Sequence, residues 1–139
     1  MADINLLTYN TKIEECIHPV DFDDAATTGD YVSMKNYDAV TVFIYTGTFA
    51  GTGLTVTVEQ CTQDADAGSD AKAISPAKTI TGAANTIASV NIAGEEMDAD
   101  GNFDWLKVTC TDPGSAAIGC VFVIGYRSRW AEATMPALV

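Results

Sequence analysis

The feature that most constrains the fold is the alternation of apolar and polar residues in two pairs of segments. The first pair reads DAVTVFIYTGT and GLTVTVEQCT, with a glycine-bearing turn between them. The second pair reads FDWLKVTCT and AAIGCVFVIGY, joined by an Asp-Pro-Gly-Ser turn. Because strand side chains point alternately to opposite faces, this pattern predicts half-buried antiparallel strands. We predict that the strands of each pair lie side by side as a hairpin, 39–48 with 54–62 and 103–111 with 116–126.

The apolar positions of these four strands define a candidate core. It is expected to contain Val40, Val42, Ile44, Leu54, Val56, Val58, Leu106, Val108, Phe122 and Ile124. Burying each of these side chains contributes about 1.5–3 kcal/mol to folding. The fold class that follows is all-β, an antiparallel β-sandwich of jelly-roll type with extended N- and C-terminal arms.

The segments between and around these strands are less regular. A short strand is expected at 31–34, a further strand at 86–92, and a short strand at 95–97. Pro76 restricts 71–80 to an edge strand or two short pieces, because proline cannot donate to the ladder. Residues 1–28 are predicted to be an arm or a short edge strand. The expected organisation is an N-terminal arm (1–28), a β-sandwich domain (29–130) and a C-terminal tail (131–139).

Charge excludes one large class of partners. Among 139 residues, 7 Lys and Arg face 19 Asp and Glu, for a net charge of −12. Such a surface repels phosphate backbones, so no nucleic acid is expected as a partner. No apolar run approaches the ~18 residues of a membrane span, so no membrane is expected either. The first residues lack the pattern of a secretory signal, so the protein is expected to act where it is made or to leave by lysis.

The cysteines are predicted to be free thiols rather than ligands or bridges. The chain has four cysteines without a CxxC pair, and one histidine, His18. A zinc site needs about four ligands, so no zinc or other cofactor is expected. Without a secretory signal the compartment is reducing, and no disulfide is predicted. Cys110 and Cys120 lie in apolar strands and are interpreted as small core residues.

Calcium binding and catalysis have weak support in the sequence. Counted from Glu96, the next acidic residues fall at positions three and five and Gly101 at position six of an EF-hand loop. Position twelve is Lys107, a cation where the main carboxylate ligand belongs, so a solvated acidic turn is favoured over a calcium loop. No nucleophile, base and orienting group occur together around His18 or elsewhere. The chain is therefore not expected to be an enzyme.

The two ends of the chain are the candidate interface. They carry apolar and aromatic residues outside the predicted strands, and Tyr126 is followed by both arginines of the chain. Aromatic residues and arginine are enriched in interface hot spots. Packing of Trp130 over an open edge of the sandwich explains the same residues equally well. The candidate partner-binding residues are Leu6, Leu7, Tyr9, Arg127, Arg129, Trp130 and Leu138.

A resemblance extends over roughly residues 1–130. The stretch GDYVSMKNYDAVTVFIYTGTFAGTGLTVTVEQC (29–61), with FDWLKV and the strand 116–127, is similar to a group of small virion proteins of tailed bacteriophages. Members with an assigned role resemble capsid decoration (cement) proteins, β-sandwiches that trimerise outside the head. The resemblance implies a homotrimer bound to the major capsid protein on the outer surface of the virion, after synthesis in the host cytoplasm. A tail, baseplate or fibre module that binds a receptor or glycan is the alternative.

Overall fold

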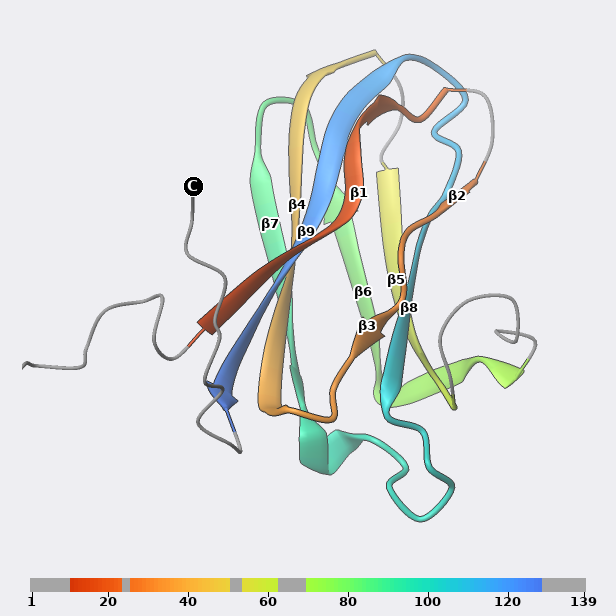
Figure 1. Ribbon diagram of the computed structural model, residues 1–139. Helices are drawn as coiled ribbons and strands as arrows, with labels where there is room; N and C mark the ends of the chain where they lie inside the picture. The colour runs from red at the N-terminus through yellow and green to blue at the C-terminus, as the bar shows by residue number, and fades with distance from the viewer. Residues whose placement is uncertain (1–10, 24–25, 51–53, 63–69, 129–139) are drawn as a thin grey trace, which may run out of the picture.

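Two antiparallel sheets packed face to face form the molecule in the computed structural model (Figure 1), which describes residues 11–23, 26–50, 54–62 and 70–128. The first sheet has the order β1 (Thr11–Asp21), β9 (Ala117–Ser128), β4 (Tyr37–Phe49), β7 (Ile87–Ala93). The second has the order β2 (Thr27–Thr28), β8 (Trp105–Cys110), β5 (Leu54–Cys61), β6 (Lys72–Gly82), and β3 (Val32–Ser33) also pairs with β8. The predicted all-β sandwich is confirmed.

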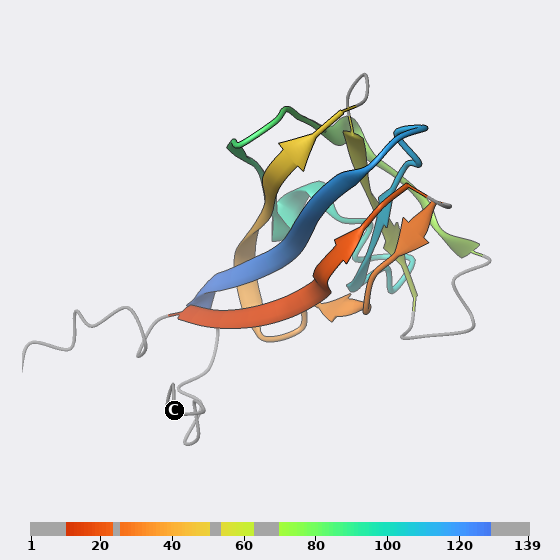
Figure 2. The same ribbon diagram turned by 90° about the horizontal axis from the view of Figure 1, so that it is seen from above.

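The order of the strands is that of a jelly roll. Apart from the β5–β6 hairpin and the step from β2 to β3 along β8, each described connection carries the chain from one sheet to the other. The view from above shows the two layers that these crossings join (Figure 2). A jelly roll leaves only its outermost strands as edges, and here these include β1 and β7 in the first sheet and β6 in the second.

The two predicted hairpins are wrong, although all four strands exist. β4 pairs with β7 and β9, whereas β5 pairs with β6 and β8, so the first pair of segments lies in different sheets. The strands β8 and β9 are likewise divided between the two sheets. The alternation of apolar and polar residues shows which side of a strand faces the core. It does not show whether the next strand along the chain pairs with it or lies in the opposite sheet. The chain therefore passes from one sheet to the other between Phe49 and Leu54 and again between Cys110 and Ala117.

The core lies between the inner faces of the two sheets. The expected core residues of β4, β5 and β8 are all buried: Val40, Val42, Ile44, Leu54, Val56, Val58, Leu106 and Val108. In β9 the prediction was wrong by one residue, because Val121 and Val123 are fully buried and Phe122 and Ile124 are half-buried on the outer face. The strand is apolar at almost every position, so alternation could not assign its faces.

The predicted N-terminal arm contains a long edge strand. β1 pairs with β9 from Thr11 to Asp21, with two irregularities in the register. Cys16, Ile17 and the following Phe22 are buried in the core. The sandwich therefore extends back to Thr11, ahead of the expected boundary at residue 28.

Three of the smaller elements agree with the sequence and one does not. The expected strands at 31–34 and 86–92 correspond to β3 and β7, and β6 is an edge strand whose register shifts in the region of Pro76. The expected strand at 95–97 is instead a single 3₁₀ turn, η2 (Gly94–Glu96). The Glu96 carboxylate accepts a hydrogen bond from the Ala93 N–H at 2.9 Å, which folds the chain back on itself.

One glycine in β9 is required by close packing. A Cβ placed on Gly125 would lie 2.9 Å from the Tyr37 ring, which real contacts do not allow. The missing side chain lets the buried Tyr37 ring lie against the sheet at the start of β4. Substitution at Gly125 would therefore displace an aromatic core residue.

Candidate interaction surface

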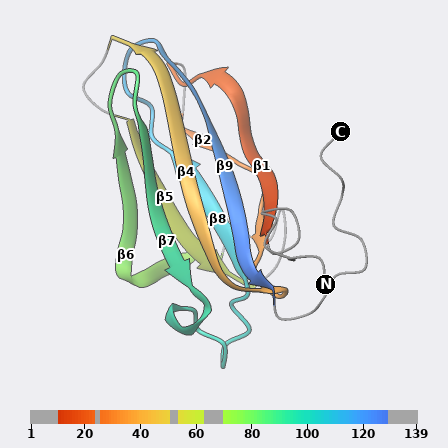
Figure 3. The same ribbon diagram turned by 90° about the vertical axis from the view of Figure 1, so that its left-hand side faces the viewer.

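The outer face of the first sheet is uncharged on three of its strands. Pairing places Ala39, Thr41, Phe43 and Tyr45 of β4 beside outward positions of β7 and β9. Those neighbours are Ile87, Ser89, Asn91 and Ala93 of β7 and Cys120, Phe122, Ile124 and Tyr126 of β9. None of the twelve is charged, in a chain with a net charge of −12. We call these twelve residues, with Ile13 of β1 and Ile118 of β9, the uncharged face; Figure 3 shows its four strands from β7 to β1.

The exposed apolar side chains of the described residues gather on this face. The large apolar side chains that are exposed are Ile13 (45%), Tyr45 (56%), Ile87 (59%) and Ile118 (54%), and all four belong to it. Near its centre the rings of Phe43 and Phe122 stack with their centroids 5.1 Å apart. Single exposed apolar residues are ordinary, but their gathering on one face makes that face the candidate interaction surface.

The outer face of the second sheet has a different composition. Its central strands place threonines and charged residues outward, including Thr57 and Glu59 of β5 and Lys107 and Thr109 of β8, which pair directly with each other. No large apolar side chain is exposed on the described part of this sheet. The two sheets therefore share one core but present chemically distinct outer surfaces.

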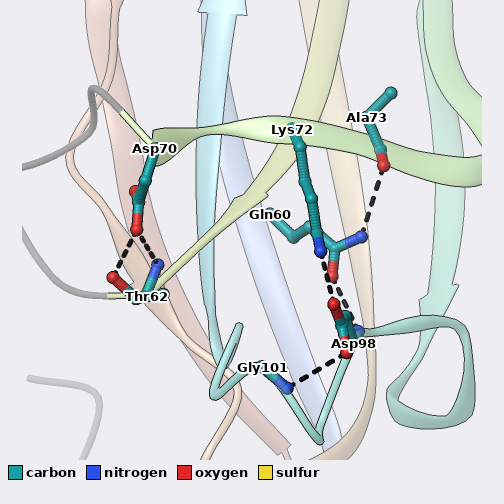
Figure 4. Close-up of polar contacts among 7 residues, drawn as sticks. All are labelled: Gln60, Thr62, Asp70, Lys72, Ala73, Asp98 and Gly101. Atoms are coloured by element: carbon teal, nitrogen blue, oxygen red, sulfur yellow. Dashed lines mark hydrogen bonds and ion pairs between the residues drawn. The ribbon is translucent and has the colours of Figure 1, made fainter.

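A polar network joins one end of the sandwich to the acidic loop at residues 97–104 (Figure 4). Gln60 of β5 is buried, with 4% of its surface exposed. Its side-chain Nε2 donates to the Ala73 carbonyl oxygen at 3.3 Å, and its Oε1 accepts from the Asp98 N–H at 2.7 Å. The Asp98 carboxylate accepts from the Gly101 N–H at 3.1 Å and pairs with Lys72. The loop is thus tied to β5 and β6.

Glu96 and Asp98, two acidic residues of the motif considered for calcium, are engaged by lysines. The hydrogen bond from Lys72, with that from the Gly101 N–H, holds the pKa of Asp98 below its usual value. Glu96 is 2.6 Å from the Lys78 ammonium, and this hydrogen bond, with that from the Ala93 N–H, lowers the pKa of Glu96. Within the described ranges no three His, Cys, Asp or Glu side chains form a group that could hold a metal ion. Both carboxylates thus have lysine partners.

A small cavity lies beside this loop. It measures about 240 Å³ and is lined by Met34, Lys35, Gly94, Met97, Ala99, Asn102, Phe103 and Asp104. Pockets for drug-sized ligands occupy about 300–1,000 Å³. The volume of this cavity is below that range. Its lining contains one ion pair, in which the Lys35 Nζ lies 3.3 Å from the Asp104 Oδ2.

The cysteines differ in exposure. Cys16, Cys61 and Cys110 are buried, and burial raises the pKa of Cys16 and of Cys110 to about 12. Cys110 is a core residue, as predicted. Cys120 is not, because it is half-exposed on the uncharged face, opposite Tyr45 in the register. The error has the same origin as that at Phe122, the uniformly apolar sequence of β9.

The predicted interface residues lie at the limits of the described chain. Leu6, Leu7, Tyr9, Arg129, Trp130 and Leu138 fall outside the described residues. Arg127 is in β9, one residue before Ser128, which pairs with Tyr37. Their part in binding stays a prediction. The uncharged face was missed, and the one sequence signal for it was the continuous apolar run of β9.

No protein-family model matches the chain, and no curated protein matches it in sequence. Among solved structures it is similar to one described as "Bacillus endospore appendages form a novel family of disulfide-linked pili", with 18% identity, a TM-score of 0.42, and coverage of 85% of this chain and 91% of that one. It is also similar to Tobacco streak virus coat protein, with 11% identity, a TM-score of 0.38 and coverage of 94% of each chain.

A third similar structure is that of infectious bursal disease virus, Gx strain. The identity is 11%, the TM-score is 0.37, and the match covers 90% of this chain and 35% of the viral one. The three structures are thus two viral proteins and a pilus protein, and each is only distantly similar to this chain. Among the described residues of the present chain, no helix is long and apolar enough to cross a membrane.

Proposed function

We propose that this chain is a structural virion protein that binds the outer surface of a tailed-phage capsid and stabilises the head as a decoration protein. The observation that carries the proposal is a two-sheet body whose exposed large apolar side chains gather on one face of an otherwise acidic chain, which is typical of a protein that works inside an assembly. A cement protein needs a rigid body, a contact surface and solubility, and no chemistry of its own. We accordingly propose that it is not an enzyme.

The fold and the charge support this role. Jelly rolls are common in viral capsid domains, because two packed sheets give a rigid module with few open edges. A net charge of −12 keeps a high-copy protein soluble. It also repels DNA, so binding to nucleic acid would not compete with binding to the outside of the capsid. Weak single contacts suffice when many equivalent copies bind one particle.

The proposed partner is the major capsid protein, and the proposed assembly on the particle is a homotrimer. We assign the capsid contact to the two chain ends, around Leu6, Leu7, Tyr9, Arg127, Arg129, Trp130 and Leu138. Aromatic residues and arginine there supply the groups that dominate interface energies.

Electron cryo-microscopy of particles from the phage that encodes this chain tests the proposal. The expected result is density for the β-sandwich on the outer surface of the head, with the chain detected in the same particles by mass spectrometry. Density on the tail, baseplate or fibre would favour the alternative, a tail module. Absence of the chain from purified particles would refute a virion role.

A further inference from the structure

Nothing in the described part of the chain covers the outer side of the uncharged face, although the sequence of β9 is typical of a strand covered on both sides. Strands that are buried on both sides have near-continuous apolar sequences, whereas strands with one wet side alternate. β9 is of the first kind, with Val121 and Val123 inside and Phe122 and Ile124 outside. The described residues cover only the inner side of β9, and its outer side has the composition of a surface that another layer covers.

We propose that the partner of this face is a second copy of the same chain, packed sheet against sheet. The inference rests on the proposed function only in that both treat the chain as an assembling protein: the sheet-to-sheet contact joins two copies, is separate from the proposed trimer on the particle, and leaves the chain ends for the capsid. A sheet face of this kind packs best on another apolar sheet face, about 10 Å away, with side chains interleaved. Among the residues that the structure describes, the uncharged face is the one outer sheet face of that kind. The bulky Phe43 and Phe122 rings lie in register with the small Ser89. Large and small side chains in one row give the raised and recessed positions that interleaved packing needs.

The outward positions of β4, β7 and β9 carry no charge, so they match a partner surface that is also uncharged, and the same face of a second copy is such a surface. Two chains with a net charge of −12 repel each other through their acidic surfaces. The uncharged face is where they can approach without burying carboxylates, whose desolvation costs several kcal/mol each. β1 brings two acidic residues to this side of the sheet, Glu15 in register with Phe122 and Asp21 in register with Ile118, so we expect the contact to centre on β4, β7 and β9. A basic partner would instead be drawn to the acidic loops.

The size of the face fits a modest interface. Four strands about 4.8 Å apart, over seven residues of about 3.4 Å each, give roughly 400 Å² in plan. Accessible surface exceeds plan area, yet the total stays near the lower end of specific interfaces, which bury about 800 Å² per partner. We therefore expect copies to associate at micromolar rather than nanomolar concentrations.

Sedimentation velocity of the purified full-length chain tests the proposal without any capsid. The substitution Ile87→Glu puts a charge on the exposed edge of the face, and Thr81→Glu is its control, since Thr81 is exposed on β6, the edge strand of the other sheet. Both variants add one negative charge, so long-range repulsion changes equally. We expect wild type and Thr81→Glu to associate between about 5 and 200 µM, and Ile87→Glu to raise the dissociation constant about tenfold or more.

Alkylation of the Cys120 thiol shows whether the association uses this face. The other three cysteines are buried, so a maleimide reports mainly on Cys120. In wild type its reaction should slow as the protein concentration rises, and in Ile87→Glu it should not. Tyr45→Glu, also at an exposed position of the face, should behave like Ile87→Glu. Equal thermal unfolding of the variants and wild type excludes misfolding as the cause.

Three results would overturn the inference. They are a wild-type monomer up to about 200 µM, equal effects of Ile87→Glu and Thr81→Glu, and association that leaves the rate at Cys120 unchanged. A monomer would mean that the face is covered by the chain ends or by another protein. Since no capsid is present in these measurements, their failure leaves the proposed virion role standing, and absence from the virion leaves the association standing.

Discussion

Replacement of Gln60 by leucine should separate the acidic loop at 97–104 from the sandwich. Leucine has nearly the same volume and suits the buried site, so packing is largely kept. It cannot replace the bonds that Gln60 makes to the Asp98 N–H at 2.7 Å and to the Ala73 carbonyl at 3.3 Å. The first is short and partly buried and contributes about 1.5 kcal/mol, and the second is longer and contributes about 0.5 kcal/mol.

The free energy of unfolding of Gln60→Leu should therefore fall by about 2 kcal/mol. Urea unfolding followed by tryptophan fluorescence measures this loss. Thr57→Val is the control, because Thr57 lies on the same strand but faces outward, and its effect should stay within about 0.5 kcal/mol. Native-state hydrogen exchange supplies a local measurement, in which the Asp98 amide should exchange faster in Gln60→Leu.

The reasoning fails under one combination of results. If Gln60→Leu loses less than about 0.5 kcal/mol and the Asp98 amide keeps its protection, the glutamine does not hold the loop. The lysine pair at Asp98 would then be sufficient to hold it, and the loop position would depend on exposed charges. Salt would distinguish the two cases, since exposed ion pairs weaken with ionic strength while hydrogen bonds to a buried amide do not.

Acid should weaken the protein through Glu96. The hydrogen bond from Lys78 lowers the pKa of Glu96 below its ordinary value, so its contribution to stability is present above that value and is lost as the pH falls through the folded pKa. Glu96→Gln should therefore show a shallower loss of melting temperature as the pH falls below about 5. Intact mass without reductant should show no loss of hydrogen from protein made in a reducing cytosol, and a deficit of about two mass units per bridge would contradict the prediction for the cysteines. Deleting residues 1–10, which precede β1, should weaken binding to empty capsids in a co-sedimentation assay while circular dichroism stays unchanged, whereas wild-type occupancy would show that these residues are dispensable.

Alternation predicted the faces of three strands and could not predict their neighbours. The periods in β4, β5 and β8 placed Val42, Val56 and Val108 correctly, because each strand has one apolar and one more polar side. Pairing depends on where the links at each strand end lead, and the short links that cross the sandwich have the same turn residues as hairpins. The jelly-roll order became visible only in three dimensions.

The uncharged face could not be predicted from any one segment. Tyr45 and Ile87 are 42 residues apart in the sequence and are brought together as partners in the register of β4 and β7. Each looks like an ordinary strand residue in its own segment. Only the sequence of β9, which is apolar at both the inward and the outward positions, indicated a second apolar face. Its Phe122 and Ile124 were interpreted as core because these residue types are usually buried.

The last two strands of the chain occupy the middle of the two sheets. β9 lies between β1 and β4, and β8 lies between β5 and the short strands β2 and β3. During synthesis the second sheet therefore lacks β8 until Cys110 has been made, and the first sheet lacks β9 until Ser128 has been made, so β1 has no partner strand until every other strand exists. Such high contact order slows folding and prolongs exposure of apolar strands to other nascent chains. We therefore expect productive folding of the first sheet to start only once β9 has left the ribosome.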